Sequence, residues 1–197
     1  MRQLAAGLGV TAGAAYRHFE SRDDLLGVLV RIGFDRLQQR FAAAFKINEA
    51  PANAIEARRR LQRLAWSHLT FADNEAALWR LMFGVQAAPY RANPGPENTS
   101  SSARYLPAAL KGLFNTGVVP RAPLDVDVLY AWSAIHGLAM LRAGKIAAAL
   151  VSLSHLATAF TDHTIEALGG QHSYGHPPHA REVKPLPTRA TSPAAPD

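Results

Sequence analysis

Apolar residues recur at intervals of three and four along most of this chain, and stretches in which apolar and polar residues alternate are nearly absent. The first spacing places apolar side chains on one face of an α-helix, whereas alternation places them on one face of a strand. We therefore expect an all-α fold. Helices are predicted over Arg22 to Lys46, Ala52 to Asp73, Glu75 to Ala88, Ser101 to Asn115 and Asp125 to Ala143, and over a last region to Leu168 that is interrupted near residues 152–154.

The two longest predicted helices have recognisable ends and faces. Ser21 followed by Asp24 is typical of a capping box at the start of the first. In the second, we expect an inward apolar face and an outward basic face. The inward residues are Ile55, Leu61, Leu64, Ala65, Leu69 and Phe71, and the outward ones are Arg58, Arg59, Arg60 and Arg63. Such an arginine run can contact phosphate, but we favour a solvated helix face, the usual role of charged runs on amphipathic helices.

Composition narrows the possible classes of protein. The chain has 197 residues, no cysteine and a formal net charge of +6. Without cysteine there is no disulfide, thiolate metal site or cysteine nucleophile, which suits the reducing cytoplasm where we expect the protein. No stretch approaches the roughly 18 uncharged apolar residues of a membrane span, so we expect no membrane partner. The positive charge favours a polyanionic partner such as nucleic acid, although a mildly basic solvated surface explains it equally well.

The first twenty residues read as helix, tight turn and helix. Arg2 to Leu8 has helical spacing, Gly9 permits a turn, and Thr11 can cap a helix that continues to Phe19. In a helix-turn-helix motif the second helix enters the major groove of DNA, and small residues early in it allow a close approach to base edges. Hydroxyl and imidazole groups further along can hydrogen-bond phosphate oxygens.

This segment resembles the start of TetR-family regulators. The ordered residues are Leu4-Ala5, Gly9-Val10-Thr11, Tyr16-Arg17-His18-Phe19, Ser21-Arg22 and Leu25-Leu26. The resemblance implies a helix-turn-helix protein that binds double-stranded DNA. It implies DNA contacts by Thr11, Ala12, Gly13, Ala14, Tyr16, Arg17, His18 and Arg22. For Phe19 we favour core packing.

Two features depart from the family pattern. At the positions of Ala12 and Ala14 the family commonly has Lys or Arg and Ser or Thr, so two polar contacts to DNA are missing. The family also normally carries one more helix before the position of Arg2. The segment from Met1 to Phe45 is then two-thirds of a DNA-binding module with its connecting helix. We expect a misassigned start, and we expect a chain that begins at Met1 to bind DNA weakly.

The later part of the chain resembles a TetR subclass with a Trp-His-Gly signature, here Trp132, His136 and Gly137. This resemblance implies a helical domain that binds a small apolar or amphipathic effector in an apolar cavity. Candidate linings are Trp66, Leu69, Trp79, Phe83, Trp132, His136 and Met140. Aromatic residues at helical spacing are more often plain core, so each residue taken singly has a competing structural interpretation.

Enzymatic and metal-binding functions have little support in the sequence. His136 lacks a Ser and Asp at triad spacing and a second metal ligand three or four residues away. His172, His176 and His179 form only a loose cluster in a segment rich in Pro and Ser. We therefore expect no enzyme activity, no cofactor and no metal.

These features lead to one function and one alternative. The chain is predicted to be a ligand-responsive repressor that binds a palindromic operator as a homodimer. The alternative is a helical small-molecule-binding dimer that no longer binds DNA specifically. The last two helices should form the interface through Leu138, Leu141, Ile146, Leu150, Leu153, Leu156, Ala157 and Phe160. Predicted domains are 1–46 for DNA binding, 47–168 for ligand binding and dimerisation, and 169–197 as a disordered tail.

Overall fold

A computed structural model describes residues 6, 7, 9, 11–84, 102–144 and 151–170. Throughout these residues the secondary structure is helical, with no strand, as the apolar spacing predicted. The helices are α2 (Ala12–Tyr16), α3 (Arg22–Ala44), α4 (Ala54–Asn74), α5 (Ala76–Phe83), α8 (Tyr105–Asn115), α9 (Asp125–Ala143) and α10 (Leu153–Gly169). Among the described helices, none is both long enough and apolar enough to cross a membrane.

Helix ends follow the local chemistry of the sequence. The Ser21 hydroxyl accepts a hydrogen bond from the Asp24 backbone N–H at 3.0 Å, and Asn53 caps α4 in the same way. At the end of α8, Gly117 has a φ of 73°, a conformation that glycine adopts without steric cost. Predicted boundaries agree to within about two residues for α3, α4 and α9. The predicted loop at 89–99 and the tail lie outside the described residues.

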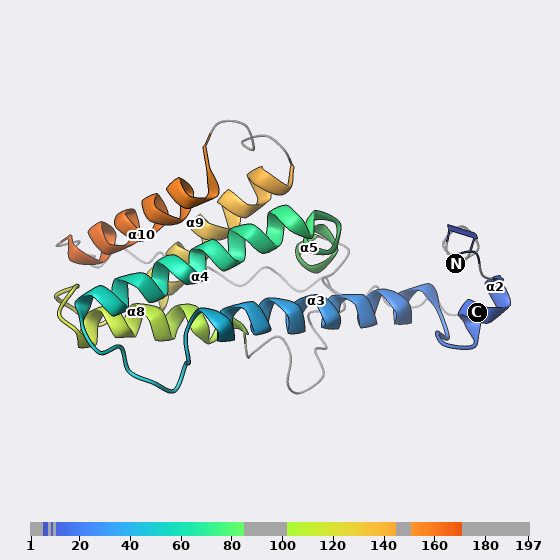
Figure 1. Cartoon of the computed structure of the whole chain (residues 1–197), viewed down its shortest axis with the longest axis horizontal. Coiled ribbons are helices and arrows are strands. Elements are labelled where there is room, and N and C mark those ends of the chain that lie inside the picture. The colour runs from blue at the N-terminus through green and yellow to red at the C-terminus, as the bar shows by residue number, and fades with distance from the viewer. Residues whose placement is uncertain (1–5, 8, 10, 85–101, 145–150, 171–197) are drawn as a thin grey trace, which may run out of the picture.

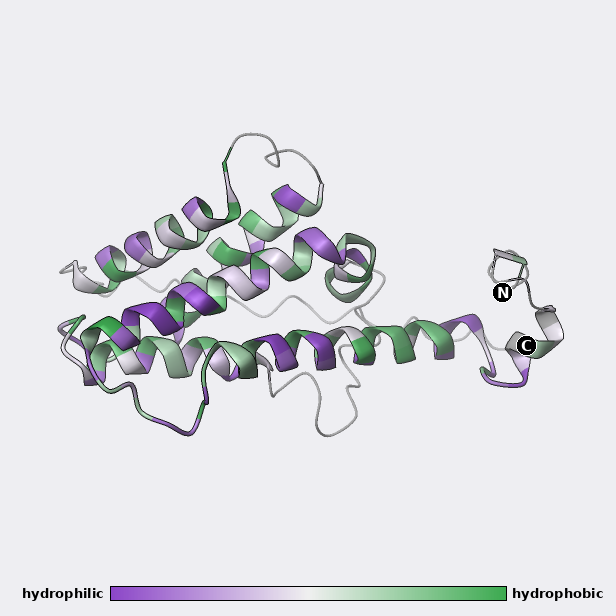
Figure 2. Ribbon diagram, viewed as in Figure 1, coloured by the Kyte–Doolittle hydropathy of each residue, from purple (hydrophilic) through white to green (hydrophobic). Residues whose placement is uncertain are grey.

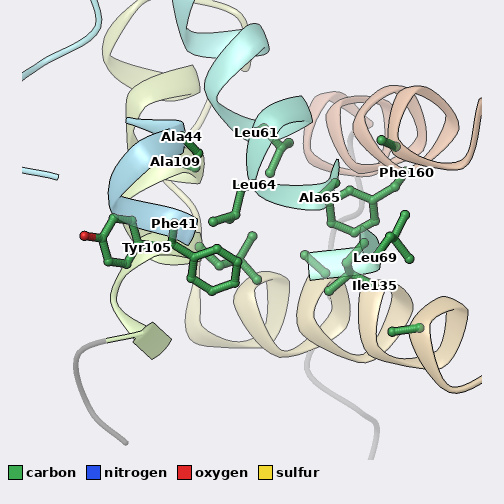
Figure 3. Packing of buried hydrophobic residues seen from close by; sticks show 14 of the residues in the cluster. Phe41, Ala44, Leu61, Leu64, Ala65, Leu69, Tyr105, Ala109, Ile135 and Phe160 are labelled. Atoms are coloured by element: carbon green, nitrogen blue, oxygen red, sulfur yellow. The ribbon is translucent and has the colours of Figure 1, made fainter. Parts of the chain in front are cut away.

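Helix α4 is the centre of the bundle. It packs against α3, α8, α9 and α10, which surround it in Figure 1. Its buried side chains include Leu61 and Leu69, which no solvent reaches, and Figure 3 shows how they meet residues from the neighbouring helices. The Phe41 and Tyr105 rings, from α3 and α8, have their centroids 5.7 Å apart. This apolar burial is the main force holding the bundle together.

The first half of α3 extends beyond the bundle toward α2. Figure 1 shows α2 at the far end of this extension, and Figure 2 shows that the extension is largely apolar. The second half of α3 packs on α4 and α5. One continuous helix therefore joins the predicted DNA-reading segment to the bundle.

The predicted faces of α4 need two corrections. Arg60 is buried rather than outward: its guanidinium bonds Glu56 at 3.1 Å, donates to the carbonyls of Glu49 and Ala50, and lies over the Phe45 ring. These partners replace water around the charge and so offset the cost of burying it. Ile55, predicted inward, is 64% exposed because it lies in the first turn of α4.

A buried arginine ties three segments together. Arg142 of α9 pairs with Asp73 of α4 at 3.0 Å and donates to the carbonyl of Val151, which precedes α10. A charge held in this way is fixed in position, because breaking one partner leaves it in an apolar environment.

Candidate functional site

The described part of the predicted DNA-reading segment is mostly exposed. Gly9 has a φ of 68°, as the predicted turn requires, and its N–H bonds the Ala6 carbonyl. The Thr11 hydroxyl accepts from the Ala14 N–H at 3.2 Å and so caps α2. Helix α2 ends at Tyr16 rather than at the predicted Phe19, and a turn follows. Most of the predicted helix from Arg2 to Leu8 lies outside the described residues.

The polar residues proposed as DNA contacts lie on the surface. Tyr16 is 54% exposed, and Arg17, His18 and Arg22 are exposed as well. Phe19, predicted to pack in the core, is half-buried. Within α2, Gly13 is exposed and Ala14 half-buried; for Ala12 only the helical backbone is described. A hydroxyl, an imidazole and two guanidinium groups thus lie within seven residues, a set that suits contact with phosphates.

A second group of side chains forms a cluster of rings inside the bundle, here called the ring cluster. Its members come from three helices: His68 from α4, Trp79 and Phe83 from α5, and Trp132 and His136 from α9. The His68 ring centroid lies 4.6 Å from that of Trp79, 5.3 Å from that of Trp132 and 5.8 Å from that of His136. The Phe83 and His136 rings are 4.4 Å apart.

Sequence reasoning missed His68, the central member of the ring cluster. It is 1% exposed, and within the described residues neither of its ring nitrogens has a hydrogen-bond partner. Burial lowers the pKa of His68 from its usual value of 6.5 to about 3, with a smaller contribution from His136. Its position, four residues after Leu64 and seven after Leu61, is the signal that could have found it, since both leucines face inward.

Two of the predicted effector contacts lie away from the ring cluster. Trp66 and Met140 are each 44% exposed. Trp66 lies two residues before His68 and so on another side of α4, because successive residues of a helix are about 100° apart. Met140 lies one turn beyond His136, toward the end of α9. The structure brings together Trp79, Phe83, Trp132 and His136, while buried Leu69 is next to His68 in the chain.

Two hollows lie next to each other at the ring cluster. A cavity of about 10 Å³ is lined by His68 and by Phe41, Leu64, Ala65, Leu106, Trp132, Ile135 and Phe160. A groove of about 320 Å³ runs between α8 and α9, with Leu106 and Trp132 among its lining residues. These two side chains therefore form the wall that the cavity and the groove share.

Another apolar groove, of about 580 Å³, follows α9 and α10 on the surface. We call it the α9/α10 groove; its linings are Tyr130, Ser133, Ala134, Gly137, Leu138, Leu141, Leu156, Ala159, Phe160, His163 and Thr164. A Cβ atom added at Gly137 would meet no atom of the described residues within 4 Å. Of the predicted interface residues, Ala157 is buried within the bundle, and Ile146 and Leu150 lie outside the described residues.

Comparison with known protein families matches both parts of the chain. Residues 1–29 match the family described as "Bacterial regulatory proteins, tetR family". Residues 61–168 match "Tetracyclin repressor-like, C-terminal domain". The chain belongs to the TetR family. It is therefore a helix-turn-helix, DNA-binding transcriptional regulator and not an enzyme.

A solved structure shares the fold of this chain. The chain is similar to "Structure of a protein with unknown function from Rhodococcus sp. RHA1", with 28% sequence identity and a TM-score of 0.64. The similarity covers 86% of this chain and 84% of the other. A search of curated proteins found no match.

In this TetR protein, α5 connects the ring cluster to the helix that carries the DNA-reading segment. Phe83 packs edge-on against Phe34 of α3, with ring centroids 5.5 Å apart. A Cβ atom at Gly33 would overlap the Met82 sulfur, so α3 and α5 touch closely there. At the other end of α5, Glu75 pairs with Arg36 at 2.9 Å.

No group of three or more potential metal ligands occurs in the part of the chain that the structure describes. His172, His176 and His179 lie outside the described residues. His136 lies among the rings of Trp79, Phe83 and Trp132.

Proposed function

We propose that this TetR regulator is a ligand-responsive repressor that binds a palindromic operator as a homodimer. The observation that carries the proposal is that α3 bears the DNA-reading segment at one end and contacts the ring cluster, through Phe34 and Phe83, nearer the other. We keep the division into a DNA-binding module at 1–46, an effector and dimer domain at 47–168 and a tail at 169–197. We also assign the Trp-His-Gly subclass on Trp132, His136 and Gly137.

The proposed DNA contacts divide by chemistry. Tyr16, His18 and Arg22 bind phosphates and set the position on the duplex, while Arg17 reaches a phosphate or a base edge. Thr11, Ala12, Gly13 and Ala14 bring the backbone of α2 close to the bases. The exposure of these polar side chains supports the proposal.

The dependence of operator affinity on salt tests these contacts. Removing one phosphate-binding side chain lowers the slope of log affinity against log salt by about 1. We expect Arg17→Ala to show this decrease in gel shifts with DNA flanking the gene. Arg59→Ala is the matched control, because Arg59 is an exposed arginine on α4. Equal slopes for the two variants and the wild type would show that Arg17 binds no phosphate.

A homodimer formed by α9 and α10 is supported by the α9/α10 groove. In the single chain its wall includes Tyr130, which is 60% exposed, and Leu141. The open space above Gly137 lets a partner helix approach closely. Side chains of this kind on two paired helices match the apolar centre of a four-helix contact between subunits.

Charge placed in the α9/α10 groove should separate the subunits. We expect Gly137→Glu to shift sedimentation from dimer toward monomer, because an unpaired carboxylate buried in the interface costs several kcal/mol. Ala43→Glu on the exposed side of α3 is the control and should remain dimeric. A dimeric Gly137→Glu protein would place the interface elsewhere.

The effector of this proposal is a small apolar or amphipathic molecule bound beside the ring cluster, with Leu69, Trp79, Phe83, Trp132 and His136 around it. It must bind the DNA-competent and DNA-free conformations unequally, since equal binding shifts nothing. Displacement of α5 would then move α3 and change the spacing of the two α2 helices.

The decisive experiment is a gel shift on the flanking DNA, with the chain that begins at Met1 and with a chain extended by the codons upstream of Met1. A specific complex with either chain, abolished when Tyr16 and His18 are both replaced by alanine, is the expected result. Absence of any complex at low salt would refute the repressor and favour a dimer that binds only small molecules.

A further inference from the structure

We propose that His68 is the polar anchor of the effector site and that the effector is an uncharged, mainly aromatic molecule with one hydroxyl or carbonyl group. The inference rests on the proposed function, because it names the chemistry of the ligand at the same site. It assigns a role to a residue that neither the sequence pattern nor the family signature singled out.

The first observation is the unsatisfied state of a deeply buried polar group. A buried nitrogen that makes no hydrogen bond costs about 1–3 kcal/mol, and such atoms are rare in folded proteins. Within the described residues, both nitrogens of His68 and the indole N–H of Trp79 are in this state. The two rings are 4.6 Å apart, so the unmet hydrogen-bonding capacity is concentrated at one place.

The second observation is that His68 faces an empty space. It is the polar member of a cavity whose other linings are apolar: Phe41, Leu64, Ala65, Leu106, Trp132, Ile135 and Phe160. A cavity of about 10 Å³ is just large enough for one water molecule. A hydroxyl or carbonyl of a ligand can take the place of such a water and form the same hydrogen bond.

The charge of the ligand follows from the lining. Among the described residues, no charged side chain lines the cavity, so an anionic or cationic group there would be buried without a partner, at a cost that excludes it. Burial also holds the pKa of His68 at about 3, which keeps the imidazole neutral. A neutral imidazole offers one donor and one acceptor: a ligand hydroxyl can bond to either nitrogen, whereas a ligand carbonyl can accept from the N–H.

The body of the ligand has room in the groove between α8 and α9. This groove of about 320 Å³ is mainly apolar, with Pro107, Val128 and Leu129 among its linings and the carboxylate-bearing Asp125 as its charged lining residue, and it reaches the size of small-molecule sites. Leu106 and Trp132 separate it from the cavity. Rotation of these two side chains joins the hollows, so that the polar group reaches His68 while the rings of the ligand stay in the groove.

Equilibrium dialysis with two probes tests the proposal on the full chain without DNA. The probes are 1-naphthol, which carries a hydroxyl, and naphthalene, which does not. We expect the wild type to bind both and His68→Phe to lower the preference for 1-naphthol over naphthalene by about 2- to 12-fold, the effect of one net hydrogen bond. His155→Phe, at an exposed histidine of α10, should keep the wild-type preference.

Several results would overturn the proposal: an unchanged preference in His68→Phe, failure of both probes to bind the wild type, or tight binding of the anion 1-naphthoate. If His68→Phe does not fold, as judged by circular dichroism, ¹⁵N-histidine NMR of the wild type decides. The histidine that stays neutral at pH 5 should shift with 1-naphthol and not with naphthalene; equal shifts would refute the anchor. Because no DNA is present, failure of the repressor proposal leaves these outcomes unaffected.

Discussion

The buried His68 makes the stability of this protein depend on pH in a predictable way. In the unfolded chain its imidazole binds a proton near the usual pKa of 6.5, whereas in the folded protein the pKa is about 3. Between these two values the unfolded state holds a proton that the folded state excludes. Lowering the pH through this range therefore destabilises the fold, and above about pH 7.5, one unit above the unfolded-state pKa, the contribution of His68 no longer changes with pH.

The size of the effect follows from the two pKa values. At about pH 5 the solution is about 1.5 units below the unfolded-state pKa of 6.5. Lowering the pH from about 7.5 to about 5 therefore lowers the free energy of unfolding by about 2 kcal/mol through His68. Urea unfolding followed by circular dichroism at both pH values, at one fixed protein concentration, measures this decrease in stability. Carboxylates and other histidines also titrate in this range, so the informative quantity is the decrease in the wild type minus the decrease in His68→Phe.

We expect that difference to be close to 2 kcal/mol. At neutral pH, His68→Phe should unfold within about 1 kcal/mol of the wild type, because removal of two unsatisfied nitrogens offsets the cost of fitting a new ring. Equal pH dependence in the two proteins would refute the reasoning, since His68 would then be protonated in the fold. A destabilisation above about 3 kcal/mol at neutral pH would show that the imidazole makes structural hydrogen bonds.

Two further substitutions test the contacts that hold α3 and α9 in place. Gly33→Val should lower the free energy of unfolding by about 1–3 kcal/mol, because the valine side chain overlaps Met82. The control Ala43→Val, on the exposed side of α3, should change it by less than about 0.5 kcal/mol. Equal urea midpoints for the two variants would show that α5 moves aside without cost. Asp73→Ala should lower the free energy of unfolding by up to about 3 kcal/mol, which is the lower end for a broken buried ion pair because Asp73 is partly exposed. Asp73→Glu should recover part of this loss if the ion pair with Arg142 is responsible.

Much of the fold was predictable because periodicity and capping are local. Ser21 and Asp24 begin α3 through contacts three residues apart, and Gly117 ends α8 through its own backbone conformation. Such signals do not depend on the rest of the molecule. Arg60 shows the opposite case: its burial depends on the carbonyls of Glu49 and Ala50, which the chain brings back over the first turns of α4.

The candidate site was predictable only in part, because it depends on contacts between helices that are distant in the sequence. Trp79 and Trp132 stood out as large rings at helical spacing, and the fold brings them to the ring cluster. Trp66 stood out equally but is 44% exposed. The sequence could not show this, because the apolar face of a helix is too wide to indicate which ring points to the centre of the bundle. His68 was missed because one polar residue among inward apolar residues is easily taken for a break in the pattern. Its role becomes visible only from the structure, where both ring nitrogens are buried without a hydrogen-bond partner among the described residues.

The energies separate what would recognise the effector from what would switch the repressor. A hydrogen bond to His68 contributes about 0.5–1.5 kcal/mol, whereas moving a two-state equilibrium from 1:99 to 99:1 takes about 5.5 kcal/mol. The remaining 4 kcal/mol or so requires about 160 Å² of apolar surface, buried in only one conformation. In a dimer with two effector sites, each site has to supply only half of the total.

The small energy of the hydrogen bond to His68 constrains where the structural change begins. His68 is held in α4, which contacts α3, α5, α8, α9 and α10, so we expect a hydrogen bond to it to leave these helices in place. The apolar body of the effector instead pushes on Trp132, and through His136 on Phe83, whose ring is 4.4 Å from His136 and 5.5 Å from Phe34 of α3. Naphthalene should therefore weaken operator binding almost as strongly as 1-naphthol once both are saturating, with 1-naphthol acting at lower concentration. A response to 1-naphthol alone at saturation would place the switch at His68 itself.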